Sequence, residues 1–131
     1  MPGAINEIKA PTVTPDDFRR IALGMKDAAE SSHMDHPDFR VNGRIFATLH
    51  PDMQWGMVKL TPEEQQRFVK DAPGVFKPEN GAWGLQGCTA VRLDGADEEM
   101  VGEAMTLAWR TTAAKPPSKI KAGRDSRPKP R

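Results

Sequence analysis

Residues 36–60 read HPDFRVNGRIFATLHPDMQWGMVKL, a segment in which Asn42-Gly43 separates two apolar-rich runs, Phe39–Val41 and Arg44–Leu49. Asn-Gly is the strongest short hairpin signal, because both central residues of a type I′ turn need a positive φ. The segment therefore predicts a β-hairpin, and residues 54–60 predict a third antiparallel strand after it.

A two-residue turn also predicts the register of the two strands. We expect Phe39 opposite Phe46 and Arg40 opposite Ile45, since directly opposed residues share one face of a sheet. By the same register Arg40 and Arg44 leave the hairpin on opposite faces. We therefore do not expect all four strand cations, Arg40, Arg44, Lys59 and Arg92, to converge on one surface.

Capping residues and apolar periodicity predict three helices. The first begins after Thr14, with Pro15 at its first position, and its apolar pattern fades only at Ser31-Ser32. A capping box at Thr61-Pro62-Glu63-Glu64 begins the second, which runs to about Asp71. The third follows Asp97 and runs to about Ala113.

Two further strands complete the expected order α-β-β-β-α-(β)-β-α: one over residues 87–93 and a short one over 75–77, with the rest of residues 75–86 irregular. This order predicts an α+β fold of two layers, with helices packed on an antiparallel sheet. We expect a flexible N-terminal lead over residues 1–13, one domain over 14–114, and a basic, disordered tail over 115–131.

Charge is distributed unevenly along the 131 residues, although the net charge is only +1. The tail carries seven Lys or Arg side chains and one Asp, which leaves 12 of the 19 basic and 17 of the 18 acidic residues in the rest of the chain. No apolar run is long enough to span a membrane, and no secretory signal is recognisable. One cysteine, Cys88, fits a reducing compartment, so we expect a cytoplasmic protein.

Five segments, in order, resemble the YjbR/MmcQ-like family of small, mostly uncharacterised bacterial proteins: His36-Pro37-x-Phe39-Arg40-Val41-x-Gly43-Arg44-Ile45-Phe46-Ala47, Met57-Val58-Lys59-Leu60, Pro73-Gly74-Val75-Phe76, Trp83-Gly84 and Val91-Arg92-Leu93-Asp94. The resemblance covers about residues 16–114. It implies a double-wing type of α+β domain that is often labelled DNA-binding by fold analogy. It brings no established catalytic residues, so we expect no enzyme and no cofactor. The basic tail is not part of the family pattern.

Nucleic acid is the first partner to consider, because strand cations and the tail could neutralise phosphates. The alternative is that the strand cations are solvated and pair with Asp38, Asp94 or other neighbours. The acidic balance of the domain argues against a strong footprint. The candidate cations are Arg40, Arg44, Lys59, Arg92, Lys119, Lys121 and Arg124.

The third interpretation is an enzyme that acts on a small anionic ligand in a pocket near His36, Lys59 and Trp83. A metal site is disfavoured, because His33 and His36 lie at an expected helix end that runs into Pro37 and not on one ordered helical face; hydrogen-bonded or loop-capping histidines are the alternative. The candidate metal ligands are His33, Asp35, His36, Asp38 and His50.

Cys88 as a nucleophile would need a lowered pKa and an oriented histidine, and its expected place in mid-strand suits a buried side chain better. Trp55 and Trp83 could stack on bases, or they could cover an edge of the core. We expect core filling from Met25, Met57, Met100 and Met105.

These observations favour a weak nucleic-acid-binding module that uses the hairpin and the tail. The alternative is a protein-interaction or chaperone-like module with an exposed apolar patch on the sheet or around Trp83.

Overall fold

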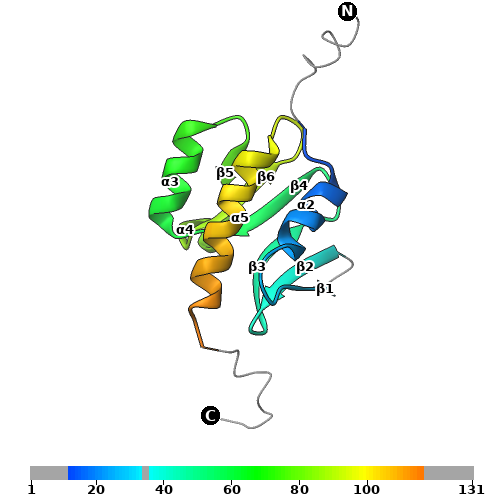
Figure 1. Ribbon diagram of the computed structural model, residues 1–131. Coiled ribbons are helices and arrows are strands. Elements are labelled where there is room, and N and C mark those ends of the chain that lie inside the picture. Colours follow the sequence, from blue (N-terminus) through cyan, green and yellow to red (C-terminus); the bar gives the residue numbers. More distant parts are fainter. Residues whose placement is uncertain (1–11, 34–35, 117–131) are drawn as a thin grey trace, which may run out of the picture.

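The computed structural model describes residues 12–33 and 36–116, which form one antiparallel sheet with helices packed on it (Figure 1). The strand order is β1-β2-β3-β4-β6-β5. The strands are β1 (Ala29–His33), β2 (His36–Val41), β3 (Arg44–Leu49), β4 (Trp55–Lys59), β5 (Phe76–Pro78) and β6 (Cys88–Arg92). The helices are α2 (Pro15–Leu23), α3 (Pro62–Asp71), α4 (Gly81–Leu85) and α5 (Glu98–Ala113). The predicted α+β class is confirmed.

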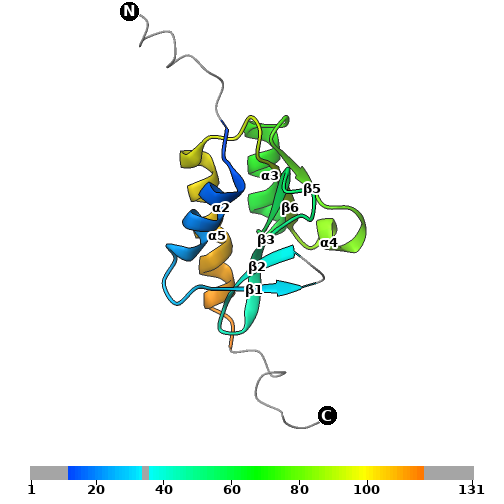
Figure 2. The ribbon, with the colours of Figure 1, turned by 90° about the vertical axis from the view of Figure 1, so that its right-hand side faces the viewer.

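The helices divide between the two faces of the sheet. Figure 2 shows α2 and α5 on one side and α4 projecting on the other, while α3 packs beside β5. The face under α2 and α5 carries the core, which includes the fully buried Phe18, Phe39, Phe46, Leu49 and Met105. The opposite face, called the open face below, is left for polar and charged side chains.

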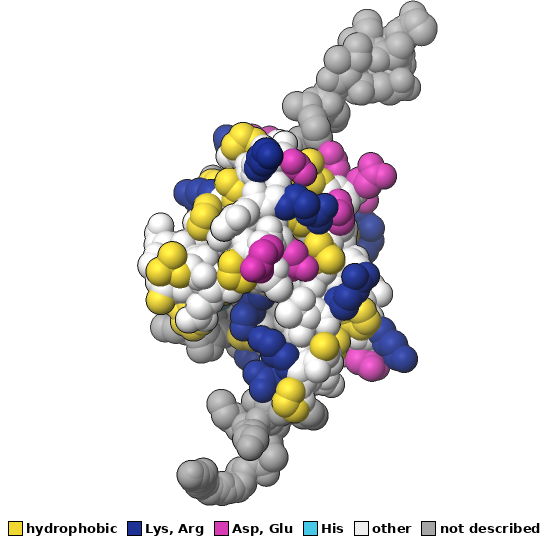
Figure 3. All heavy atoms as spheres, turned by 90° about the vertical axis from the view of Figure 1, so that its left-hand side faces the viewer, with side chains coloured by type: hydrophobic (Ala, Val, Ile, Leu, Met, Phe, Trp, Pro, Cys, Tyr) yellow, Lys and Arg dark blue, Asp and Glu magenta, His cyan; other side chains and the backbone are white. Residues whose placement is uncertain are grey.

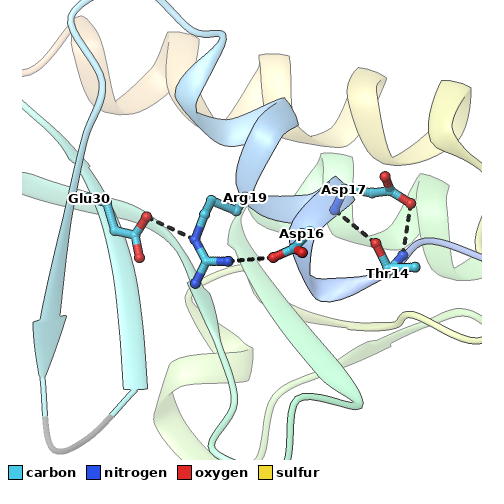
Figure 4. Close-up of polar contacts among 5 residues, drawn as sticks. All are labelled: Thr14, Asp16, Asp17, Arg19 and Glu30. Carbon is cyan, nitrogen blue, oxygen red and sulfur yellow. Dashed lines mark hydrogen bonds and ion pairs between the residues drawn. The ribbon is translucent and has the colours of Figure 1, made fainter.

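Helix α2 begins at the predicted threonine cap, which is part of a full capping box. The Thr14 hydroxyl accepts from Asp17 N–H, and the Asp17 carboxylate accepts from Thr14 N–H, each at 3.0 Å (Figure 4). These bonds lower the pKa of Asp17. Arg19 then joins this helix to β1, because its guanidinium bonds Asp16 at 2.8 Å and Glu30 at 2.9 Å. The predicted capping box at Thr61 is also present.

The prediction that the first helix runs to about residue 30 is wrong. It ends at Leu23, and residues 29–33 form β1, which pairs antiparallel with β2. The chain reverses through Asp27, whose φ is +62°, a value incompatible with a continuing helix. Apolar periodicity could not show this, because Met25 and Ala28 still pack against the core from the turn.

The predicted register holds at Arg40, which pairs with Ile45, but fails at Phe39, which pairs with Ala47 and not with Phe46. The register shifts between Phe39 and Arg40, so that β3 has one extra residue there. Phe46 and Ala47 are both fully buried. The bulge thus lets two consecutive residues face the core.

The second and third helices and the remaining strands lie close to their predicted positions. Helix α4 was not predicted, because residues 75–86 were expected to be irregular. The packed part of the chain also begins before Thr14: Val13 is buried, and its N–H donates to Leu93 O at 3.0 Å. Within the described residues, no helix is long and apolar enough to cross a membrane.

Gly56→Ala should lower the free energy of unfolding by about 1–3 kcal/mol, because the new methyl would lie 2.6 Å from Phe18 Cε1 in the core. Gly102→Ala is the matched control. Its Cβ meets no atom within 4 Å, and alanine in a helix interior should stabilise the protein by about 0.5–1 kcal/mol. Urea denaturation of both variants measures the difference, and equal stabilities would contradict the packing described.

Candidate functional site

A groove with a volume of about 720 Å³ opens on the open face of the sheet. In β4 the side chains alternate: Gly56 and Val58 are buried in the core, whereas Met57 and Lys59 face the groove. The groove extends from the β2–β3 hairpin to α4. Its lining includes His36, Arg40, Arg44, Ile45, Thr48, His50, Met57, Lys59, Glu79, Trp83 and Cys88.

The structure brings the two candidate sets together: His36, Lys59 and Trp83, the candidate ligand pocket, line the same groove as the hairpin cations Arg40 and Arg44. The register pairs Arg40 with Ile45 and Arg44 with the buried Val41, so the two arginines leave the hairpin from opposite faces, as predicted, and Arg44 borders the groove at the hairpin end. Met57, predicted to fill the core, lies on the open face instead, because the alternation along β4 places it beside Lys59.

Arg40 is held by a buried carboxylate. Its Nε donates to Asp38 Oδ1 at 2.8 Å and its Nη2 to Asp38 Oδ2 at 3.1 Å. Asp38 is fully buried, while the Arg40 side chain is 32% exposed. The bonds to Asp38 raise the pKa of Arg40, with burial opposing them. Arg40 is therefore largely neutralised, as the sequence alternative of pairing with Asp38 anticipated.

Arg44 joins the hairpin to the end of α5. Its Nε donates to Pro116 O at 2.8 Å, and Asn42 Nδ2 donates to Ala113 O at 3.1 Å. Neither contact involves a carboxylate, so the charge of Arg44 is not neutralised by them. Because Pro116 is bonded to Arg44, the basic sequence that follows residue 116 begins beside the hairpin.

The far wall of the groove is formed by Trp83 of α4 and by Glu79 and Asn80, which precede this helix. His50 Nε2 lies 2.8 Å from Glu79 Oε2, which joins the β3–β4 turn to the strand leading into α4. Gly84 lies so close to Glu79 that a Cβ there would be 1.8 Å from Glu79 O. This close approach fixes α4 against the end of β5.

Gln65 of α3 fixes α4 from the other side, and sequence reasoning missed it. It is a buried polar residue, and its Nε2 lies 3.0 Å from both Gly84 O and Cys88 O and 3.2 Å from Thr89 Oγ1. Its position among the charged residues of an amphipathic helix gave no signal of burial. The Glu79–His50 contact was also missed, because 29 residues separate the two side chains.

The two tryptophans named as stacking candidates lie in different settings. Trp83 is 65% exposed and lines the groove, so it does not cover an edge of the core. Trp55 is half-buried, and Lys77 Nζ lies 4.7 Å from its ring centroid. Only Trp83, of these two, can offer a largely free ring to a ligand in the groove.

Arg92 is not part of the groove. It lines a separate cavity next to Trp55, and its Nη2 lies 4.0 Å from Asp94 Oδ2. Lys119, Lys121, Arg124 and Asp35 lie outside the described residues. In the part of the chain that the structure describes, no group of three or more His, Cys, Asp or Glu residues is placed to hold a metal ion.

Cys88 lies opposite Lys59 in the β4–β6 register and is buried. Burial raises the pKa of the Cys88 thiol, the nearby Lys59 charge partly opposes this, and Glu79 adds to it. The thiol is therefore kept protonated, which is the opposite of what a nucleophile needs.

Seen from the side of α3 in Figure 3, several Lys and Arg side chains gather on the lower part of the molecule. Most Asp and Glu side chains on this face lie above them. Other Lys and Arg side chains lie among the acidic ones in the upper part of this face, so charges of both signs are mixed there.

Comparison with known proteins finds a matching family model and a solved structure of similar fold. The YjbR family model matches residues 23–111. The crystal structure of the Deinococcus radiodurans protein DR2400, which carries a DUF419 domain, superposes with a TM-score of 0.69 at 21% identity, covering 88% of this chain and 89% of that one. At this identity the likeness shows a common fold. No curated protein matches the sequence.

Arg40→Ala should lower the free energy of unfolding by about 3 kcal/mol, because it leaves the buried Asp38 carboxylate without its partner. Arg40→Lys should cost less, since it keeps a cation near Asp38 but loses the paired hydrogen bonds. Urea denaturation measures both variants. An Arg40→Ala protein as stable as the wild type would show that the pair is not structural.

Iodoacetamide should alkylate Cys88 at pH 8 about 10-fold or more slowly in the native protein than in the urea-unfolded chain. Burial both shields the sulfur and raises its pKa, so the thiolate fraction is small at this pH. The native rate should keep rising with pH beyond the range in which the unfolded chain levels off. A native profile with its midpoint at or below that of the unfolded chain would contradict this.

Proposed function

This chain belongs to the YjbR family, and we propose that it is a non-enzymatic module that binds nucleic acid weakly through the groove, the β2–β3 hairpin and the basic segment after α5. The observation that carries the proposal is the convergence of Arg44 and Lys59 in one groove, beside the point where that basic segment begins.

Arg44 and Lys59 are the cations best suited to meet phosphates. Among the described residues, neither has a carboxylate within ion-pair distance, whereas Arg40 is bonded to Asp38. Lys119, Lys121 and Arg124 follow in sequence within eight residues of Pro116. A polyanion in the groove would meet Lys59 and Arg44, and we propose that these cations of the following sequence add to the attraction.

Weak binding follows from the charge balance. Residues outside the tail carry an excess of acidic side chains, and only a few cations are free to release counterions from a nucleic acid. A role in binding alone, without catalysis, is supported by the groove's chemistry. Its cysteine is kept protonated, and His50 is bonded to Glu79 and not to a nucleophile.

Protein recognition is the second candidate, and a specific feature favours it. Trp83 is 65% exposed and Leu85 is 83% exposed, and both lie on α4. Two large apolar side chains on one short exposed helix could be covered by a protein partner. Nothing in the groove's charge distribution calls for such a partner, so we place this function second.

The double variant Arg44→Ala/Lys59→Ala in the full chain should weaken binding to a labelled DNA oligonucleotide. Its slope of log affinity against log salt should fall by about 2, since each phosphate-contacting cation contributes about 1. Fluorescence anisotropy across a salt series measures both quantities.

Lys26→Ala/Lys70→Ala is the matched control, because it removes two exposed cations that do not line the groove. Equal losses in the two double variants would mean that net charge alone decides binding. If neither single- nor double-stranded DNA binds the full chain at low salt, the proposal fails and the protein-recognition candidate remains.

A further inference from the structure

The groove combines apolar surface, which suits the face of a base, with positive charge, which suits a phosphate. Ile45, Met57 and the exposed ring of Trp83 provide apolar surface, and Arg44 and Lys59 provide positive charge. In a duplex the base faces are stacked on one another, so an aromatic side chain can reach a base face only when that base is unstacked.

We propose that the groove receives one unpaired nucleotide, with its base against Trp83 and the apolar lining and its phosphate near Lys59 and Arg44. This inference rests on the proposed function of the groove as a nucleic-acid site and names the form of the ligand. The chemistry is shared by two sources, a nucleotide within a single strand and a free mononucleotide.

The size of the groove supports a ligand of this kind. Its volume of about 720 Å³ lies within the range of about 300–1,000 Å³ that is usual for sites holding small molecules. Such a concavity accommodates a base with its sugar and phosphate.

Trp83 is held in place before any ligand arrives. Gln65 donates to Gly84 O, next to Trp83, and the close approach of Gly84 to Glu79 fixes the helix. The indole is nonetheless largely exposed. A ring on a fixed short helix loses little conformational freedom when a base stacks on it, which favours stacking as its role.

The lining of the groove places the positive charge of Lys59 beside apolar surface. The one carboxylate that lines the groove among the described residues, Glu79, is bonded to His50. Lys59 lies on β4 with the apolar Met57 as its neighbour on the same face. A phosphate beside Lys59 therefore meets no unbonded carboxylate in the groove, while a base beside it meets apolar surface.

The test compares three fluorescein-labelled probes of equal length by anisotropy with the full chain: single-stranded oligothymidylate, an abasic strand with the same phosphates, and a duplex. We expect oligothymidylate to bind about 10-fold more tightly than the abasic strand, because only the former offers bases for stacking. Trp83→Ala should abolish this difference and leave the affinity for the abasic strand unchanged. Trp83→Phe should keep most of the difference.

Leu85→Ala is the matched control, because Leu85 is exposed on the same helix and does not line the groove. It should behave as the wild type in every titration, and circular dichroism melts should show that both variants fold. Competition with thymidine monophosphate distinguishes the sources: displacement of the strand at micromolar concentration indicates a free nucleotide, and no displacement at millimolar concentration indicates a strand.

Equal binding of oligothymidylate and the abasic strand would overturn the nucleotide inference while leaving the proposed electrostatic function intact. A Trp83→Ala variant that loses affinity for all three probes equally would also overturn it, since the residue would then act only on the structure. Failure of every probe to bind would remove the proposed function and this inference together.

Discussion

The burial of Phe39 is the constraint on which the rest of the structure depends. This ring is fully buried, and its centroid lies 6.1 Å from that of Phe18 on α2, at an interplanar angle of 57°. Gly56 leaves the space that the Phe18 ring occupies over β4. Since side chains alternate along a strand, fixing Phe39 in the core places Asp38 and Arg40 on the open face. The inner packing thus decides which residues can line the groove.

Helix α4, which forms the wall of the groove opposite the hairpin, is held by polar contacts and not by packing into the core. Helix α4 is short, and its large apolar residues, Trp83 and Leu85, are exposed, so hydrophobic burial alone would not hold it. The Gln65 amide supplies the missing attachment by bonding to backbone oxygens of both α4 and β6. Both oxygens also accept backbone N–H groups, Gly84 O from Gly87 and Cys88 O from Glu79, so the amide adds a second donor to each. The buried Gln65 amide is itself the group that would be left unsatisfied if α4 moved away.

Much of the fold was predictable, because the signals that mark it are local. The Asn42-Gly43 turn and the threonine caps of α2 and α3 depend on a few adjacent residues. The bulge beside Phe39 and the strand β1 were missed because both are decided by partners distant in sequence or by the need to bury Phe46 and Ala47 together. The candidate groove residues could be named singly, but their convergence depends on the strand order and on α4, which no periodicity revealed.

Two side-chain hydrogen bonds join the β2–β3 hairpin to the end of α5. Asn42 and Arg44 bond to the last turn of α5 and to Pro116, so the hairpin and the start of the basic segment cannot separate without breaking those bonds. An acidic domain with scattered cations would repel a polyanion over most of its surface. Arg44 and Lys59 line the groove, whereas other exposed cations, such as Lys26 and Lys70, lie elsewhere on the surface. In the proposed function it is therefore the local placement of Arg44 and Lys59, and not the net charge, that would supply the attraction for an anion.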